Sequence, residues 1–226
     1  LLVTLSCKYD NTMATFYMTT EPLQVDGKMD EEAWQKVDWR PMDQAWLGDG
    51  YSAEDFSGRY KVLWSVDRLY VLAEIVDDTL VDTHADGLDR YWDDDCLEVF
   101  LDIDASGGDH QYNYNAFAYH IALDGKVTDI DTDSLPHYYS HVVNARTQNG
   151  NKTTWELAIQ TYDDTFVRNK PSNQVKLSDG HNIGFAIAYC DNDYSPEREH
   201  FVGSIAVEGE DKNKGWIDAG IFKKVK

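Results

Sequence analysis

The stretch Arg90–Asp104, RYWDDDCLEVFLDID, decides the fold class of this chain. Along its second half two kinds of residue alternate, with Leu97, Val99, Leu101 and Ile103 on one side and Cys96, Glu98, Phe100 and Asp102 on the other. Side chains of a β-strand point alternately to its two faces. This period of two therefore predicts a half-buried strand whose aliphatic face lies in the core.

The first half of the same stretch predicts an exposed indole. Trp92 stands directly before three aspartates, where a chain that leaves a sheet enters water, and Glu98 follows six residues later. An indole face can cover a pyranose ring while a carboxylate accepts hydrogen bonds from its hydroxyls, so the pair suggests a sugar site. The alternative is that Trp92 folds back as a lid on the core and that Glu98 is a solvated strand residue.

The rest of the chain shows the pattern of short paired strands. Two hairpins are expected, Arg59–Ser65 with Leu69–Asp77 and His141–Thr147 with Thr153–Gln160. One short helix is expected at Asp30–Trp34, with Asp30 as its N-cap and Trp34 facing inward. About ten strands, one helix and no linker predict a single all-β domain, an antiparallel β-sandwich of jelly-roll or immunoglobulin-like type.

The chain is strongly acidic, with 41 acidic and 20 basic residues and a net charge of −21. A field of this sign repels phosphate groups, which excludes nucleic acids and anionic membrane surfaces as expected partners. No apolar run reaches the length of a transmembrane span. The sequence also lacks a nucleophile elbow, a zinc-protease helix, a phosphate-binding glycine loop and a dinucleotide fingerprint, so no enzymatic activity is expected.

The first residues resemble the end of a bacterial secretory leader. Leu1–Ser6 is a short apolar run that ends in a small residue before Cys7, after which the chain turns polar. This pattern predicts a leader remnant and N-terminal strand over residues 1–22, lipidation of Cys7, and an extracellular, cell-surface or periplasmic location. The alternative is an ordinary first strand, which could pair with the sheet edge of a second copy. Cys96 and Cys190 are expected to be buried thiols rather than a disulfide.

An acidic turn follows the central strand. Residues 102–107, DIDASG, carry oxygen ligands at alternate positions and then a glycine, as in the first half of a calcium loop. Asn113 stands where a bidentate glutamate would close an EF-hand, which excludes that motif. The turn predicts a looser calcium site formed by Asp102, Asp104 and Asp109, and the alternative is an acidic hairpin turn.

Several segments together resemble the family 9 carbohydrate-binding modules. They are Val25–Gly27 with Asp30–Trp34, Val62–Trp64 with Leu69–Val71, Trp92 with Asp95–Asp102, Gln111–Asn113, Ile183–Phe185, Arg198-Glu199 and Asn213–Trp216. Each segment is weak alone, but their order and spacing match over residues 23–226. The resemblance implies a β-sandwich over residues 23–226 that binds carbohydrate without catalysis, and it also implies structural calcium.

The resemblance further implies which residues hold the sugar. In the family two tryptophans sandwich a sugar ring with help from polar neighbours, and the matching positions are Trp92, Trp216, Glu98, Asn213 and Arg198. Two positions depart from the family: a sugar-contacting arginine falls at Asn113, after Gln111 and Tyr112, and a pocket glutamine falls at Ala188. We therefore expect the aromatic clamp to persist with Gln111 and Asn113 at the site, while the polar contacts that select the sugar differ.

The expected function is binding of a plant-type polysaccharide or oligosaccharide of the xylan or cellulose class. Two other functions stay open. The fold could serve as a structural subunit of an extracellular surface that associates with copies of itself. Related sandwiches also bind haem in electron-transfer proteins, and Met42 and seven histidines are available here, although no spacing singles out a pair of ligands.

Overall fold

The protein folds as two β-sheets packed face to face, in a computed structural model that describes residues 14–48, 50–172 and 174–226. The all-β sandwich expected from the sequence is confirmed. The expected lipidation site, Cys7, lies outside the described residues and stays a prediction. Within the described part of the chain, no helix is long and apolar enough to cross a membrane.

The first sheet has six strands in the order β1-β4-β5-β11-β10, with β2 paired to β4. Its strands are β1 (Tyr17–Met18), β2 (Arg40–Met42), β4 (Phe56–Ser65), β5 (Arg68–Asp77), β10 (Val142–Asn149) and β11 (Lys152–Gln160). All neighbours are antiparallel except β1 and β4. The β4–β5 and β10–β11 pairs are the two hairpins expected from the sequence.

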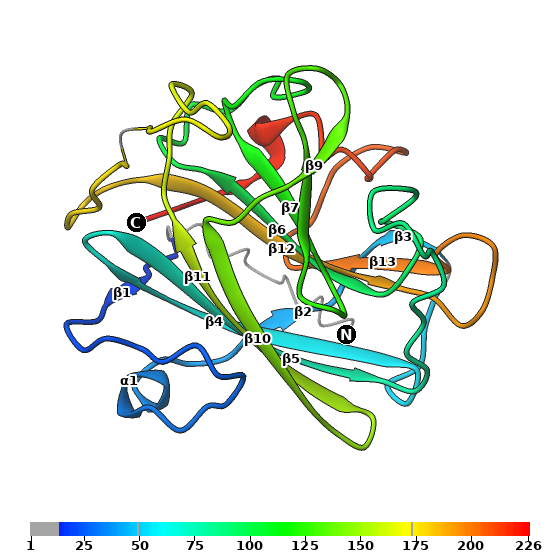
Figure 1. Cartoon of the computed structure of the whole chain (residues 1–226). Helices are drawn as coiled ribbons and strands as arrows, with labels where there is room; N and C mark the ends of the chain where they lie inside the picture. Colours follow the sequence, from blue (N-terminus) through cyan, green and yellow to red (C-terminus); the bar gives the residue numbers. More distant parts are fainter. Residues whose placement is uncertain (1–13, 49, 173) are drawn as a thin grey trace, which may run out of the picture.

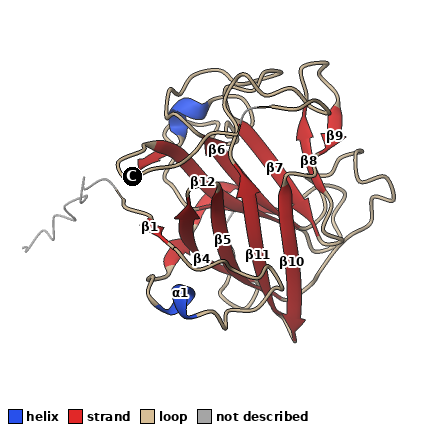
Figure 2. Ribbon diagram, turned by 60° about the vertical axis from the view of Figure 1, so that its left-hand side comes forward, coloured by secondary structure: helices blue, strands red, loops and turns tan. Residues whose placement is uncertain are grey.

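The second sheet has eight strands in the order β3-β13-β12-β6-β7-β8-β9, with β14 paired to β12. They are β3 (Gln44–Leu47), β6 (Cys96–Asp102), β7 (Phe117–Ala122), β8 (Val127–Ile130), β9 (Pro136–Tyr138), β12 (Ile183–Asp191), β13 (His200–Gly203) and β14 (Lys223–Val225). Figure 2 shows β4, β5, β11 and β10 side by side in front of β6, β7 and β12, and Figure 1 shows the same two layers from another side.

Strand β6 lies in the middle of the second sheet, between β12 and β7. Its aliphatic residues Leu97, Val99 and Leu101 lie in the main core between the sheets, as the alternation predicts. The expectation of a half-buried strand is wrong, however, because all seven residues of β6 are buried. The outward face is covered as well: Phe100 packs on Trp46 and Phe222, with ring centroids 5.9 and 5.7 Å apart.

The short helix α1 (Glu32–Gln35) begins one residue later than expected. Its N-cap is Glu31, not Asp30, and the cap makes no side-chain hydrogen bond. The inward position of Trp34 is confirmed, since the side chain is fully buried and its indole N–H donates to Glu156 Oε1 at 3.0 Å. A buried contact with β11 therefore fixes this helix, rather than a capping side chain.

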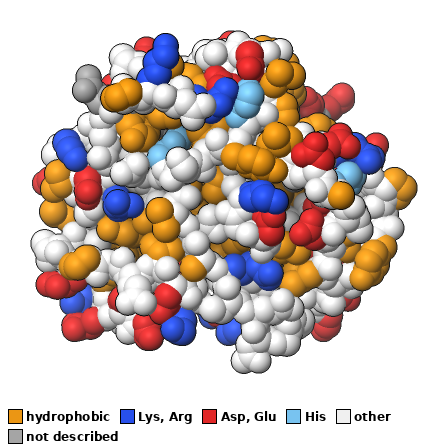
Figure 3. All heavy atoms as spheres, in the orientation of Figure 1, with side chains coloured by type: hydrophobic (Ala, Val, Ile, Leu, Met, Phe, Trp, Pro, Cys, Tyr) orange, Lys and Arg blue, Asp and Glu red, His pale blue; other side chains and the backbone are white. Residues whose placement is uncertain are grey.

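The described start of the chain pairs with its last residues. Ala14 forms a parallel bridge to Val225. The Phe16 amide donates to the Lys226 carbonyl at 2.8 Å, and the Lys226 amide donates to the Ala14 carbonyl at 3.0 Å. On the face of the molecule shown in Figure 3, basic side chains are scattered among acidic and apolar ones and form no continuous patch.

Candidate functional site

A cavity of about 360 Å³ lies beside the second sheet, on the side away from the main core, and brings together five residues expected at a sugar site. These are Trp92, Glu98, Arg198, Asn213 and Trp216. Four residues that were not expected complete its walls: Tyr91, Tyr112, His120 and Ile130. Residues more than 120 positions apart in sequence therefore converge on one hollow.

The two tryptophans of this cavity are both partly open to solvent. Trp92 is 39% exposed and Trp216 is 36% exposed. The alternative that Trp92 closes over the core disagrees with this exposure. Other hollows of about 240 and 450 Å³ lie elsewhere in the described structure, but neither is lined by two tryptophans.

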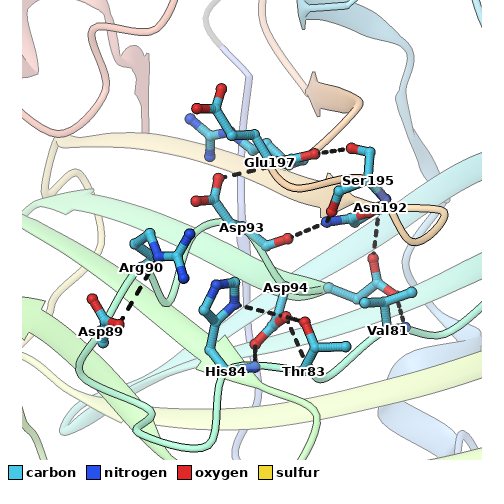
Figure 4. A network of polar contacts seen from close by, with 12 residues as sticks. Val81, Thr83, His84, Asp89, Arg90, Asp93, Asp94, Asn192, Ser195 and Glu197 are labelled. Atoms are coloured by element: carbon cyan, nitrogen blue, oxygen red, sulfur yellow. Dashed lines mark hydrogen bonds and ion pairs between the residues drawn. The ribbon is translucent and has the colours of Figure 1, made fainter.

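The loop that carries Trp92 is anchored from both sides, as Figure 4 shows. On one side the Asp94 carboxylate accepts hydrogen bonds from the Thr83 and His84 amides, both at 2.9 Å. On the other side the Asn192 amide group donates to the Asp93 carbonyl at 2.6 Å. The aspartates after Trp92 are therefore buried anchors that fix the position of the indole.

The turn that carries Trp216 is fixed by a close backbone approach. A Cβ atom at Gly215 would lie 2.7 Å from the Phe100 ring, so no larger residue fits there without a shift. The Gly215 carbonyl lies 2.8 Å from His110 Nε2, and the Ile217 amide donates to the Lys214 carbonyl at 3.0 Å. The glycine lets the chain pass close over β6 and places the next residue, Trp216, at the cavity.

Glu98 forms the charged base of the cavity. It is only 2% exposed, so it is not the solvated strand residue of the alternative interpretation. Its Oε1 atom lies 2.9 Å from His120 Nε2, 3.3 Å from Arg198 Nη1 and 3.0 Å from Cys190 Sγ. Among the described residues no hydrogen bond reaches Oε2, which leaves that oxygen free for a ligand.

Two basic side chains hold Glu98 in its charged form. Burial acts to raise the pKa of Glu98, but the neighbouring His120 and Arg198 lower it below its ordinary value. His120 Nδ1 also lies 3.0 Å from the Ala118 carbonyl, so contacts at both ring nitrogens fix the orientation of the imidazole. The guanidinium carbon of Arg198 lies over the Phe201 ring, 4.1 Å from its centroid.

Gln111 and Asn113 do not line the main cavity. They border a smaller adjoining hollow of about 10 Å³. Tyr112, between them, lines both hollows and has a positive φ of 60°. Ala188, opposite Glu98 on β12, is fully buried and offers no polar group.

The sequence analysis missed Tyr112 and His120. His120 is the cross-strand partner of Glu98, so a predicted β6–β7 register could have identified it. The sequence gives no comparable signal for Tyr112, because an unusual backbone conformation turns it toward the cavity.

The three aspartates expected to hold calcium do not form one cluster. Asp102 accepts from the Gly107 amide at 2.7 Å and Asp104 accepts from the Ser106 amide at 2.9 Å, so their carboxylates close the turn. The Asp109 backbone instead forms an isolated antiparallel β-bridge with Asp218, and its carboxylate accepts from the Gln111 amide at 3.4 Å. This arrangement fits the alternative of an acidic turn better than a shared ion site.

A different set of carboxylates does converge, at one end of the sandwich. Oxygens of Asp77, Asp95 and Asp191 lie within 4.8 Å of one another, and all three residues are buried. Burial raises the pKa of Asp77 to about 6, that of Asp191 to about 7 and that of Asp95 to about 9. These residues could hold a cation of the kind that the family resemblance implies.

Cys96 and Cys190 are buried thiols that face each other across β6 and β12, as expected. The Cys190 thiol contacts both charged groups at the cavity base. Its Sγ lies 3.0 Å from Glu98 Oε1 and 2.9 Å from Arg198 Nη1.

Comparison with known proteins agrees with this architecture. Two solved structures with 17% sequence identity are those of a family 9 carbohydrate-binding module from Caldicellulosiruptor kristjanssonii. The complex with glucose has a TM-score of 0.65 over 95% of this chain and 94% of that one, and the complex with cellotriose has 0.65 over 94% and 92%. A putative carbohydrate-binding protein from Bacteroides uniformis has 10% identity and a TM-score of 0.58 over 94% of this chain and 96% of that one.

No curated protein matches this chain in sequence. The sequence model of the family described as "Carbohydrate family 9 binding domain-like", in contrast, matches residues 25–226. Since this match covers most of the chain, the protein belongs to the carbohydrate family 9 binding domain-like family.

Proposed function

We propose that this protein binds carbohydrate without catalysis and holds a sugar ring between Trp92 and Trp216. One observation carries the proposal: two partly exposed indoles line the same cavity above a buried, charged Glu98. Indole faces pack against the C–H faces of sugar rings, while hydroxyl groups need polar partners at the ring edge. The cavity offers both kinds of contact.

The polar partners are already held in place by the protein. Glu98 Oε2 is a free acceptor, while Oε1 is occupied by His120, Arg198 and Cys190. Because these contacts fix the carboxylate before a ligand arrives, little side-chain ordering is needed on binding. Asn213 and Tyr112 also line the cavity, and both side chains carry groups that can donate and accept hydrogen bonds.

The ligand that best fits is a neutral sugar chain of the cellulose or xylan class. The net charge of −21 disfavours anionic glycans. The family members bound to glucose and to cellotriose support a β-1,4-linked chain of glucose-like rings. A cavity of about 360 Å³ is at the small end for ligand pockets, so we expect it to hold one or two rings with modest affinity.

Isothermal titration calorimetry with glucose, cellobiose, cellotriose, xylose and xylotriose tests this proposal. We expect saturable binding of at least one sugar and a loss of tenfold or more in affinity in Trp216→Ala, since stacking on an aromatic ring is lost. Glu98→Gln should also weaken binding by about tenfold, the worth of a hydrogen bond to a charged group.

The matched control is Tyr194→Ala, because Tyr194 is 74% exposed and does not line the cavity. Its affinity should equal that of the unmodified protein. Undiminished sugar binding by Trp216→Ala would rule out the clamp.

A further inference from the structure

We propose that the small hollow beside the main cavity is a pocket for the hydroxymethyl group of a hexose, so that the protein prefers glucose-type rings to xylose-type rings. The inference rests on the proposed sugar function and names the class of ring that the site selects. A glucose ring and a xylose ring differ in this one group, which xylose lacks. The hollow is therefore the place where the protein can distinguish the two.

The hollow and the main cavity are direct neighbours, because they share five lining residues. These are Tyr91, Tyr112, His120, Ile130 and Trp216. The hollow measures about 10 Å³, which is room for one water-sized group. A ring held against Trp216 reaches such a recess with a substituent that extends beyond the edge of the ring. On a neutral glucose-type ring, the hydroxymethyl group is the substituent that carries its oxygen on a carbon arm.

The walls of the hollow suit a group that has both a carbon and a hydroxyl. Ala116 and Ala118 line it, are both 3% exposed and offer small apolar side chains to a CH₂ group. Asp129 also lines it, and its carboxylate accepts hydrogen bonds from the Ala118 amide at 3.0 Å and the Ile130 amide at 2.8 Å. A purely apolar group would therefore meet a polar wall, whereas a hydroxymethyl group matches both kinds of surface.

Tyr91 supplies a hydroxyl that has no partner within the described part of the protein. The residue is 7% exposed and lines both the cavity and the hollow. Its ring is fixed by edge-on packing against Trp92 and His120, with ring centroids 5.0 and 4.6 Å away. Buried polar groups nearly always have a hydrogen-bond partner, so this hydroxyl calls for one from a ligand. A sugar hydroxyl can donate to it or accept from it.

The turn beside the hollow offers one further amide. Asn113 is occupied within the turn, because its Oδ1 accepts from the Asn115 amide at 2.9 Å and its Nδ2 donates to the Gln111 carbonyl at 3.3 Å. The Gln111 side chain, in contrast, makes no hydrogen bond with the described residues, although it lines the hollow. Its amide is therefore a second group that can bind the hydroxyl of the sugar arm.

The turn that borders the hollow, residues 108–113, is joined to the turn that carries Trp216. The His110 amide donates to the Ile217 carbonyl at 3.0 Å, and His110 Nε2 lies 2.8 Å from the Gly215 carbonyl. These contacts fix the hollow relative to the Trp216 ring before a ligand arrives. A recess of this size can discriminate between two sugars because its position does not have to be ordered on binding.

The experiment compares the affinities of three single sugars by calorimetry: glucose, 6-deoxyglucose and xylose. We expect xylose to bind about tenfold more weakly than glucose, the usual effect of one missing group in a pocket. The sugar 6-deoxyglucose keeps the carbon arm and lacks its hydroxyl, so it should bind about fivefold more weakly than glucose. Cellobiose and xylobiose repeat the comparison on longer ligands.

Two variants test the pocket itself. Ala118→Val adds two carbons at the hollow, so the preference for glucose over xylose should fall from about tenfold to about one. Tyr91→Phe removes the hydroxyl and keeps the ring, so the preference for glucose over 6-deoxyglucose should fall from about fivefold to less than about twofold. The second variant removes no hydrogen bond within the described protein, so the test holds even if Ala118→Val fails to fold.

Tyr194→Phe is the matched control, because Tyr194 is 74% exposed and lines neither space. It should keep both preferences. Equal affinity of the unmodified protein for glucose and xylose would overturn the pocket and leave the proposed function standing. Unchanged preferences in Tyr91→Phe and Ala118→Val would overturn it as well. A protein that binds none of these sugars would overturn the proposed function and the pocket together.

Discussion

Glu98 and Asp95 lie three residues apart in sequence and both are buried, but the groups around their carboxyls shift their pKa values in opposite directions. Glu98, at the base of the cavity, has His120 and Arg198 within 3.3 Å, and its pKa lies below the ordinary value. Asp95 has backbone amides and other aspartates around it, and burial raises its pKa to about 9. Both residues are at most 2% exposed.

The difference shows what each place is suited to bind. At the cavity the protein itself supplies the positive charge, so the remaining oxygen of Glu98 can accept hydrogen bonds from a neutral ligand. At the aspartate cluster no lysine or arginine of the described residues supplies positive charge, so a cation or protons must. Burial alone therefore does not distinguish the two sites, whereas the charge of the nearest partners does.

The largest effect on the free energy of unfolding is expected when Glu98 loses one of its positive partners, since its surroundings then resemble those of Asp95. Arg198→Met removes one positive partner of Glu98 while keeping much of the packing on Phe201. We expect a loss of about 3 kcal/mol in the free energy of unfolding, because a buried charge is left with one partner fewer. Chemical denaturation with a two-state fit measures it.

Arg59→Met is the control, since Arg59 pairs with Glu74 at the surface and its side chain is 46% exposed. Removing that pair should change the free energy of unfolding by less than about 1 kcal/mol. Equal losses of unfolding free energy in Arg198→Met and Arg59→Met would show that the ion pair of Glu98 contributes no more to stability than an exposed one.

A smaller effect should follow from pH in the chelator-treated protein. The folded-state pKa values of Asp77, Asp191 and Asp95 are raised to about 6, 7 and 9, so their contribution to stability is fully present below about pH 4 and declines as the pH rises through those values. Between pH 6 and pH 8 we therefore expect the free energy of unfolding to fall, because the unfolded chain has lost these protons while the folded protein still holds part of them.

Denaturation curves across this pH range measure the decline. Asp95→Asn should flatten it, because the group with the highest pKa is removed. Stability that rises with pH in chelator would show that the cluster carries no unfavourable charge.

The smallest effect should come from the thiol at the cavity base. Cys190→Ala removes the S–H group that lies 3.0 Å from Glu98 Oε1 and should weaken sugar binding by less than tenfold. Cys190→Ser keeps a donor there and should bind as the unmodified protein does. Calorimetry with the best sugar ligand compares them, and equal weakening in both variants would point to packing rather than to the hydrogen bond.

The strand pattern made much of the fold predictable from sequence. Period-two alternation placed β6, and two hairpin signals placed β4–β5 and β10–β11 with end residues shifted by a few positions. The burial of both faces of β6 was not predictable, because Trp46 and Phe222, which cover its outer face, come from distant parts of the chain. The cap of α1 was missed because Glu156, on β11, fixes Trp34 from far away in sequence.

The candidate sugar site was predictable only in part. The resemblance to the family placed Trp92, Glu98, Arg198, Asn213 and Trp216, and the structure brings all five to one cavity. Gln111 and Asn113 were placed one residue away from the true wall, where Tyr112 has a backbone conformation that no local pattern indicates. The aspartate cluster was not predictable, because its members lie at the ends of three strands and 41 acidic residues gave no reason to choose among them.

The pairing of the segment that begins at Ala14 with the segment around Val225 has a mechanical consequence. The segments around Ala14 and Val225 are parallel, and two backbone hydrogen bonds join them. A force that pulls the ends apart draws one segment backward and the other forward along the same axis. The two bonds are then loaded together in shear instead of opening one after the other, so the junction acts as a clamp on the sandwich under tension.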